Sequence, residues 1–408
     1  MEKVAELRKK LKDGTENWEE EIFRFACDFA QAVAQDIFEE LDNEMMRQRE
    51  KGMEVVGFKE HWLVTIFGDI RLKGRLYRGK GGNYRFLLDE KMGIEKGSHV
   101  SPRMKKLAIL ASTHHTFREV EQNIKAILPW GISHTTIHNL ASKVADTYTT
   151  EEEKEVKALF KDGVIPESKD KAVPYLIVEA DGVSVALQRE KERRVEVKVG
   201  IAHEGWQKIS KERYKLKEKS VYSGIMSGER FWEGFSLTLA KEYDLSQIGK
   251  VIVGGDGAPW VKRGAELLGG LYEVDRFHLK RALHRGLAND TLVAEIYQAC
   301  VVGEIDKVER LLIEAQEKAD GDKATEIMQL RGYLMDNCYG LRDYRLEVEG
   351  DGLRGLGAME GIMPDGGQYQ GKDDGAWLNT EVPALTGPHS DRPWVQVLRA
   401  LAHGGIKL

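Results

Sequence analysis

Three acidic residues stand in settings where a carboxylate could take part in chemistry. Asp181 and Asp256 each follow an apolar, β-branched run, in YLIVEADG and KVIVGGDG, and Glu360 lies far downstream in RGLGAMEG. A strand that ends in a carboxylate places the charge at the rim of a sheet, and carboxylates that converge there can hold two Mg²⁺ or Mn²⁺ ions for phosphoryl transfer. We therefore predict that Asp181, Asp256 and Glu360 are catalytic metal ligands, with Glu360 carried by a helix over the same edge.

A simpler interpretation stays open for the two aspartates. An Asp-Gly pair after a strand is most often a turn signal, and both Asp181 and Asp256 are followed by glycine. The prediction of a catalytic site therefore depends on the order of the three residues and on the elements around them.

The elements around these residues indicate a mixed α/β catalytic domain. Three consecutive strand candidates cover 174–182, 183–190 and 193–205, and they favour an antiparallel meander. Alternating helices and strands follow. They are predicted at 228–243, 250–255, 259–268, 271–274 and 276–285. Three antiparallel strands followed by alternating helices and strands is the layout of an RNase H-like fold. The helical pattern of 290–335 is then an insertion before Glu360.

The N-terminal third indicates a long helix and a β-hairpin. Residues 16–50 lack Gly and Pro and repeat apolar residues at helical spacing, which predicts one amphipathic helix for packing or dimerisation. Residues 61–78 are predicted to be two strands joined at Gly68-Asp69. Arg71, Lys73 and Arg75 share one face of the second strand, which could lie along DNA phosphates or simply face water.

Residues 116–148 predict a helix, a turn and a second helix. The break at 129–131 is followed by Ser133, a plausible N-cap residue. Short polar side chains near the start of a second helix are typical of a helix-turn-helix DNA reader, although an ordinary helical pair fits the same pattern. The candidate DNA contacts on this helix are His134, Thr135, His138, Asn139 and Lys143.

Composition and charge are ordinary for a globular protein. The chain has 408 residues, of which 41% are apolar and 31% charged, and a net charge of −6. We find no apolar run long enough to span a membrane and no apolar signal core at the N-terminus, so we expect a cytoplasmic, nucleoid-associated protein. Cys27, Cys300 and Cys338 lie far apart, which argues against a zinc site or a disulfide framework.

The chain resembles the DDE transposases of bacterial insertion sequences, near their Mutator-like branch. The residues that carry the resemblance lie in EADG at 179–182, GDGAPW at 255–260, DRFH at 275–278 and GAMEG at 357–361. A (Cys/Asp)-x-x-His element between the second aspartate and the glutamate is typical of that branch, and here it reads Asp275-x-x-His278. The segments FLLDEKMGI at 86–94 and GISHTTIHNL at 131–140 are also similar to this family.

The resemblance implies metal-dependent strand cleavage and strand transfer at the ends of an insertion sequence. Asp181, Asp256 and Glu360 would be the metal ligands, and Asp275 and His278 accessory residues. The partners would be double-stranded DNA, both terminal repeats and target, and further copies of the chain. Arg276, Lys280, Arg281 and Arg285 follow the Asp275 motif on a helix and could hold DNA near the metals.

We therefore expect a multidomain α/β protein. The expected parts are a helical region at 1–56, a β-hairpin region at 57–100, a helix-turn-helix region at 101–150, an RNase H-like DDE domain at 170–361 with a helical insertion at about 287–349, and an irregular tail at 362–408.

The tail departs from the family pattern. After Gly361 the sequence becomes rich in Gly and Pro and loses helical or strand periodicity, where a basic helical region is expected. A frameshift near 361–363 or a natural tail would explain this. The alternative function is accordingly a catalytically inactive, DNA-binding transposase remnant. A structure-specific nuclease of the same fold is a third interpretation.

Overall fold

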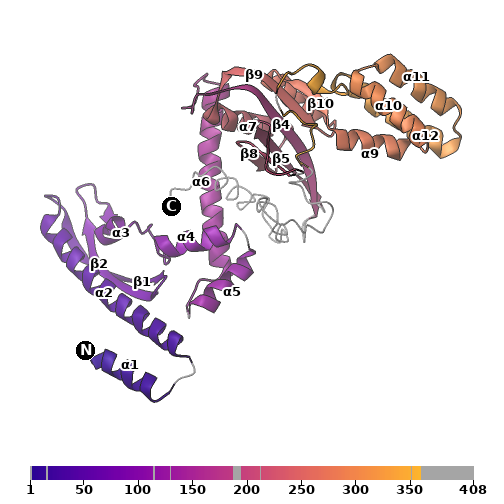
Figure 1. Ribbon diagram of the computed structural model, residues 1–408. Coiled ribbons are helices and arrows are strands. Elements are labelled where there is room, and N and C mark those ends of the chain that lie inside the picture. The colour runs from indigo at the N-terminus through magenta and orange to yellow at the C-terminus, as the bar shows by residue number, and fades with distance from the viewer. Residues whose placement is uncertain are drawn as a thin grey trace. The chain divides into compact units, whose positions relative to one another are not determined.

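The computed structural model describes residues 2–14, 17–113, 115–128, 130–186, 194–211, 213–350 and 352–359 (Figure 1). The chain is mixed α/β and divides into two compact units between Lys143 and Val144, inside one helix. We call them the N-terminal unit and the C-terminal unit. Within the described ranges, no helix has the length and apolar character needed to cross a membrane.

The N-terminal unit combines helices with a three-stranded sheet. The sheet has the order β1-β2-β3, and β1 and β2 form a long antiparallel hairpin. The strands are β1 (Glu54–Thr65), β2 (Gly68–Arg78) and β3 (Tyr84–Arg85). The helices are α1 (Glu2–Lys12), α2 (Trp18–Gln48), α3 (Leu87–Lys91), α4 (Pro102–Ala111), α5 (Phe117–Ile127) and α6 (His134–Phe160), of which α6 continues into the C-terminal unit.

The hairpin turn lies two residues before the predicted one. Thr65 pairs with Gly68, so Ile66 and Phe67 form the turn, and Gly68 begins β2 with a φ of 117°. The Thr65 hydroxyl donates to the carbonyl of Gly68 at 2.7 Å and closes the turn from inside. The prediction of Gly68-Asp69 as the turn was wrong because glycine here provides the positive φ of the first strand residue.

Helix α2 confirms the predicted long helix but buries a different face. Cys27 and Asp42 are buried, and Phe38, Leu41 and Met45 pack on the cluster formed by the sheet and α3. The apolar stripe that was predicted to serve packing or dimerisation is mostly exposed. Its exposed members are Trp18, Ile22, Phe29, Val33 and Ile37.

Helices α5 and α6 are separated by a short turn, as predicted. Thr116 and Glu119 form a capping box at the start of α5. The Ser133 hydroxyl accepts from the Thr136 N–H at 3.2 Å, which confirms Ser133 as the N-cap of α6. Helix α6 runs to Phe160 without interruption and so extends beyond the predicted end at residue 148.

The C-terminal unit is built on a five-stranded mixed sheet with the order β10-β9-β4-β5-β8 (Figure 1). Strands β4, β5 and β8 are antiparallel neighbours, whereas β9 and β10 run parallel to β4. The strands are β4 (Lys171–Ala186), β5 (Arg194–His203), β8 (Ser220–Gly224), β9 (Tyr243–Gly255) and β10 (Leu271–Val274). A separate pair is formed by β6 (Trp206–Lys208) and β7 (Tyr214–Leu216).

Strand β4 corrects the predicted meander. The segments 174–182 and 183–190 were expected to be two strands, but β4 is continuous from Lys171 to Ala186 and Gly182 pairs with Lys198 of β5. The Asp-Gly pair at 181–182 is therefore not a turn. The third antiparallel strand is β8, which the sequence analysis did not identify.

Helices cover the sheet and form the insertion. Helices α7 (Gly228–Glu242) and α8 (Pro259–Leu268) pack on one face through a cluster that includes Phe231, Trp232 and Phe235. The predicted helical stretch is confirmed, with its own core around Leu283, Ile296 and Leu334. The insertion consists of α10 (Asp290–Val302), α11 (Ile305–Glu317) and α12 (Gly321–Asp336), and α9 (Arg276–Gly286) shares its core. Two short 3-10 helices follow, η1 (Cys338–Gly340) and η2 (Tyr344–Leu346).

Candidate active site

Three aspartates follow one shared row of paired residues in the C-terminal sheet. Ala180 of β4 pairs with Gly255 of β9, and Gly255 pairs with Val274 of β10. Asp181 is the next residue of β4, and Asp256 and Asp275 are the first residues after β9 and β10. Because the strands are parallel and in register, the three aspartates lie at the same level of the sheet, where β9 and β10 end. The Asp275 N–H donates to the Gly255 carbonyl at 3.0 Å and extends the pairing by one step.

The Asp181 carboxyl is affected by burial and by neighbouring charges. Burial is the main cause that raises the pKa of its carboxyl, and the nearby charges of Asp256 and Asp275 raise it further. The N–H of Gly182, which donates to Asp181 Oδ1 at 2.7 Å, and the ring of His278 act in the opposite direction. The charges of Asp256, Asp275 and His278 therefore all act on the Asp181 carboxyl.

Asp256 is held by a turn and by the helical insertion. Its Oδ1 accepts from the Ala258 N–H at 2.8 Å, and the Tyr333 hydroxyl of α12 donates to its carbonyl at 2.9 Å. Gly257 has a φ of 98°, and a Cβ there would come within 2.9 Å of the Tyr333 ring. The insertion thus fixes the backbone beside a predicted catalytic residue. No pattern in the sequence indicates this role for Tyr333.

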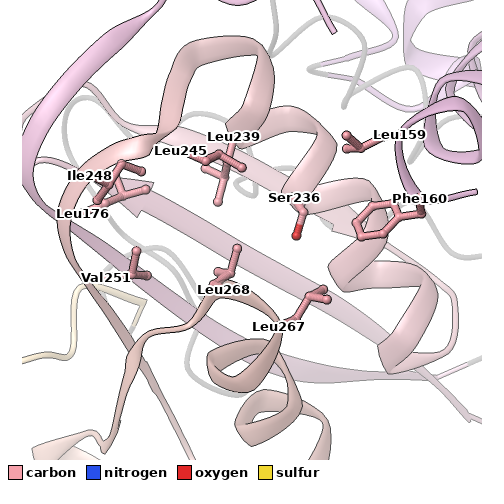
Figure 2. Close-up of a pocket in the computed structure, with 10 residues that line it drawn as sticks. All are labelled: Leu159, Phe160, Leu176, Ser236, Leu239, Leu245, Ile248, Val251, Leu267 and Leu268. Carbon is pink, nitrogen blue, oxygen red and sulfur yellow. The ribbon is translucent and has the colours of Figure 1, made fainter. Parts of the chain in front are cut away.

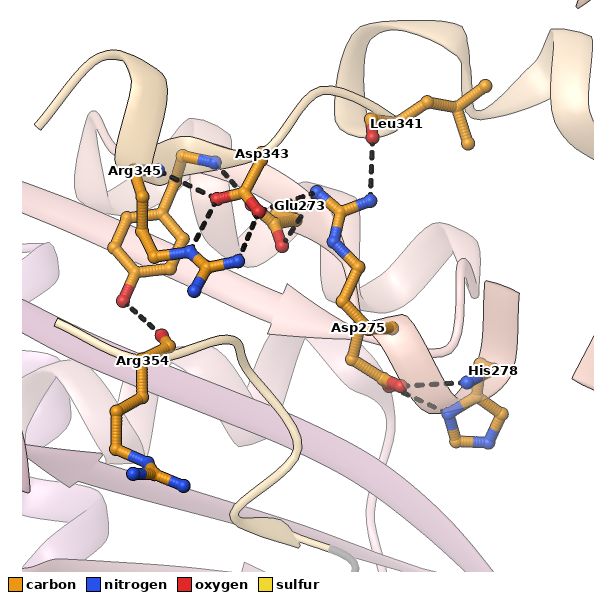
Figure 3. Close-up of polar contacts among 9 residues, drawn as sticks. Glu273, Asp275, His278, Leu341, Asp343, Arg345 and Arg354 are labelled. Atoms are coloured by element: carbon orange, nitrogen blue, oxygen red, sulfur yellow. Dashed lines mark hydrogen bonds and ion pairs between the residues drawn. The ribbon is translucent and has the colours of Figure 1, made fainter. Parts of the chain in front are cut away.

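Asp275 and His278 form one local unit at the start of α9 (Figure 3). Asp275 caps the helix, because its Oδ1 accepts from the His278 N–H at 2.8 Å, and its Oδ2 lies 2.7 Å from His278 Nδ1. The spacing of Asp275-x-x-His278 therefore has a structural cause: the carboxylate orients the imidazole while it caps the start of the helix.

At Arg276 the structure corrects the prediction of a basic face on α9. Its side chain is buried, and its guanidinium donates to the Leu341 carbonyl at 2.8 Å and lies 3.1 Å from Glu273. Burial raises the pKa of the Glu273 carboxyl to about 8, although the Arg276 charge opposes this. Asp343 completes the network at 3.8 Å from Arg276 (Figure 3). Arg276 therefore joins α9 to the segment after α12 and is not available to DNA.

Glu179, in the EADG segment at 179–182, is a functional candidate for which no role was predicted. It is buried, lies two residues before Asp181 on the same strand, and so points to the same face of the sheet. Its Oε2 accepts from the N–H groups of Gly357 at 2.8 Å and Met359 at 3.4 Å. Met359 packs on Val199 and Ile201 of β5. An acid two residues from Asp181 was the signal that could have suggested this anchor.

Glu360, the third predicted metal ligand, lies outside the described residues, as does the predicted tail at 362–408. Within the described ranges, no three His, Cys, Asp or Glu side chains are grouped so that they could hold a metal ion. Asp181 and Asp256 supply carboxylate oxygens, the donor type that Mg²⁺ and Mn²⁺ prefer.

The basic residues of the β1–β2 hairpin form ion pairs with acidic residues. Arg71 pairs with Glu60, and Lys73 lies 3.8 Å from the same carboxylate. Arg75 is held by Asp42 of α2, which is buried and also accepts from the Arg75 backbone N–H at 2.9 Å. Arg71 and Lys73 are exposed, whereas Arg75 is half-buried.

The candidate DNA contacts on α6 are all exposed, as the helical spacing predicted. They are His134, Thr135, His138, Asn139 and Lys143. Glu121 of α5 accepts from the backbone N–H of His134 at 2.8 Å and lies 2.6 Å from its Nδ1, so one acid ties the two helices together. On α9, Lys280 and Arg281 are exposed, and the Lys280 ammonium lies 5.0 Å from the centre of the Tyr297 ring.

The chain belongs to the Uncharacterised protein family (UPF0236), whose profile matches residues 12–377. It is similar to a UPF0236 protein of Caldanaerobacter subterraneus subsp. tengcongensis, with 24% identity over 80% of this chain and 67% of the relative. A UPF0236 protein of Streptococcus gallolyticus, named for its place in a vanSb 3′ region, is 25% identical over 82% of this chain and 71% of the relative.

A second relative from C. subterraneus is 24% identical over 80% of this chain and 64% of its own length, so the chain spans about two thirds of the relatives it matches. One further relative from that organism, 24% identical over 76% of this chain and 63% of its own length, has a name that joins eleven locus designations.

Proposed function

We propose that this protein is a DDE-type transposase of an insertion sequence, which cleaves DNA at the element ends and transfers the strand to target DNA. The observation that carries the proposal is the shared row at Ala180, Gly255 and Val274, because it brings Asp181, Asp256 and Asp275 to one edge of the sheet. Sites for phosphoryl transfer need carboxylates gathered in this way.

The topology supports an RNase H-like assignment for the catalytic domain. Three consecutive antiparallel strands are followed by two parallel strands that alternate with helices, and the sheet order places β4 at the centre. The helical insertion α10–α12 follows the last parallel strand and precedes the segment that leads to Glu360.

In this proposal Asp181, Asp256 and Glu360 hold two Mg²⁺ or Mn²⁺ ions. The ions would supply activation of the attacking hydroxyl and stabilisation of the leaving oxygen when bound. Tyr333 keeps the Asp256 backbone in place, and Asp275 orients the His278 imidazole toward the same group of charges. Glu179 anchors residues 357–359, immediately before Glu360.

Two further features support a mobile element. A name that joins eleven loci of one organism is expected for a gene that copies itself within a genome. Helices α5 and α6 present a polar, exposed face at the start of the second helix, which supports a helix-turn-helix for DNA recognition. Double-stranded DNA and further copies of the chain are the proposed partners.

The test is cleavage and joining of labelled DNA that carries the ends of the element, with Mg²⁺ or Mn²⁺. Asp181→Asn and Asp256→Asn should each lower the rate by at least about a hundredfold, since each removes a charged ligand. Asp162→Asn is the matched control, because Asp162 is exposed at the end of α6 and makes the same change of charge. Activity that survives Asp181→Asn would refute the proposal.

The same experiment distinguishes the alternatives. The sequence after Gly361 departs from the DDE transposase pattern, which is the reason for considering a catalytically inactive remnant. Such a remnant would bind the DNA ends without cutting them. A nuclease of this fold would cut but would not join a 3′-hydroxyl to the target.

A further inference from the structure

An apolar cavity of about 300 Å³ lies in the C-terminal unit, away from the aspartates (Figure 2). Its wall combines Leu176 of β4 and Val251 of β9 with side chains of α6, α7 and α8. Nine of the ten lining residues are apolar, and none is charged. A cavity of this size is at the lower end of the range for small-molecule sites.

The one polar lining residue is Ser236, on α7. It is 5% exposed, and its hydroxyl has no hydrogen-bond partner among the described residues. Figure 2 shows this oxygen pointing in among the leucine side chains. By contrast, the hydroxyl of Thr238, two residues later on the same helix, is paired: it donates to the Gly234 carbonyl at 3.1 Å. Burying a hydroxyl without a partner is unfavourable, so Ser236 points to a ligand that would pair with it.

The cavity opens to the surface through apolar side chains. Phe160, Leu245 and Leu267 line it and are 40%, 41% and 45% exposed, respectively. They come from α6, β9 and α8, so three elements converge on the opening. An apolar opening without a charged group would admit an uncharged molecule and disfavour an ion.

The cavity and the candidate active site are separate. Leu176 lies five residues before Asp181 within β4, and Val251 lies five residues before Asp256, the first residue after β9. At a rise of about 3.3 Å per residue, five residues span roughly 16 Å, and on β4 the odd separation places Leu176 and Asp181 on opposite faces of the sheet. Occupation of the cavity would therefore not compete with DNA at the aspartates.

We propose that this cavity binds a small, uncharged, mainly apolar molecule with one hydrogen-bonding group, and that Ser236 pairs with that group. The volume is about twice the roughly 150 Å³ cavity that holds benzene, which suits a molecule of two fused rings or a comparable aliphatic compound. This binding site is independent of the proposed transposase activity.

The test is a titration of the full chain with 1-naphthol and with naphthalene, followed by calorimetry or fluorescence. The wild-type protein should bind 1-naphthol about fivefold more tightly than naphthalene, because one neutral hydrogen bond contributes a factor of this order. In Ser236→Ala the two affinities should agree within about twofold. This variant should fold, since alanine has the higher helix propensity and removes only the unpaired hydroxyl.

A second pair of variants locates the binding. Leu267→Gln changes the opening and should weaken both ligands, whereas Leu110→Gln, on an equally exposed leucine of α4, should leave both unchanged. If 1-naphthol does not saturate the wild-type protein, if both ligands bind it equally, or if Ser236→Ala keeps the preference for 1-naphthol, the proposal is wrong.

Discussion

The two units position their candidate functional residues in different ways. The C-terminal unit does so where β9 and β10 end, and the N-terminal unit on its basic surfaces. At the strand edge, Asp181, Asp256 and Asp275 are positioned by backbone pairing, one residue beyond a common row. On the hairpin, Arg71, Lys73 and Arg75 are positioned by ion pairs with Glu60 and Asp42.

The difference teaches which sequence patterns can be relied on. Strand periodicity determines where a side chain leaves a sheet, so the convergence of the aspartates follows from the register. Whether a surface cation is available to a ligand depends on acids that come from other elements, and a local pattern does not contain them. The predictions below change one contact in each region and compare the consequences.

Among the four variants considered next, the largest loss of cleavage rate is expected for Glu179→Ala. The substitution leaves the N–H groups of Gly357 and Met359 without their acceptor and loosens the segment before Glu360. An unsatisfied buried group costs about 1–3 kcal/mol, which corresponds to a loss of cleavage rate of roughly 5- to 150-fold. Glu179→Gln keeps an acceptor and should be intermediate. Wild-type cleavage rates in Glu179→Ala would show that residues 357–359 do not support the site.

A smaller loss is expected for Tyr333→Phe. It removes the hydrogen bond to the Asp256 carbonyl, which contributes about 0.5–1.5 kcal/mol, and should lower the cleavage rate by about two- to tenfold. Tyr339→Phe is the control, because Tyr339 is 96% exposed. Equal rates for the two variants would mean that α12 does not position Asp256.

On the hairpin, Glu60→Gln should strengthen DNA binding by about two- to fivefold, because it releases Arg71 and Lys73 from an exposed ion pair of modest strength. The logarithm of affinity should also fall more steeply with salt concentration. Glu44→Gln makes the same change of charge at an exposed position of α2 and should have the weaker effect. An unchanged salt dependence in Glu60→Gln would exclude this face from DNA contact.

The smallest effect is expected on stability, at Glu121 of α5, which contacts His134 of α6. Hydrogen bonds from the Lys125 side chain, and then from the backbone and ring of His134, lower the pKa of Glu121 from 4.5 to about 2. A lowered pKa in the folded state stabilises the fold above pH 4.5, and this stabilisation is lost as the pH falls toward 2. Glu121→Gln should lower the melting temperature at pH 7, and the difference should narrow below about pH 4.5. A constant difference would contradict the assignment.

Much of the fold could be predicted because the responsible interactions are local. The bounds of α8 and β10 follow from an apolar period and from Pro259 and Gly269 at the ends of the helix. Capping residues identified the start of α6. Strand β8 was missed because it is five residues long and is stabilised by β5, its neighbour in space. The break predicted at Asp181-Gly182 failed because pairing with β5 outweighs the turn preference of the pair.

The site was predictable only in part. The strand-end aspartates were visible in the sequence, whereas Tyr333 and the role of Glu179 depend on contacts across 77 and 178 residues of chain. Arg276 looked like a surface cation by its helical position but is buried by the segment at 341–345. Such long-range contacts leave no local pattern.

The shared row also determines which kinds of genetic change the C-terminal unit can accept. Backbone pairing at Ala180 and Gly255 does not depend on which apolar side chains fill the strands, so Val-for-Ile exchanges upstream should leave the aspartates in place. Loss or gain of a single codon between Leu176 and Ala180 would instead turn Asp181 to the opposite face of the sheet. Short insertions and deletions in β4 should therefore be more damaging to the arrangement of the aspartates than most substitutions.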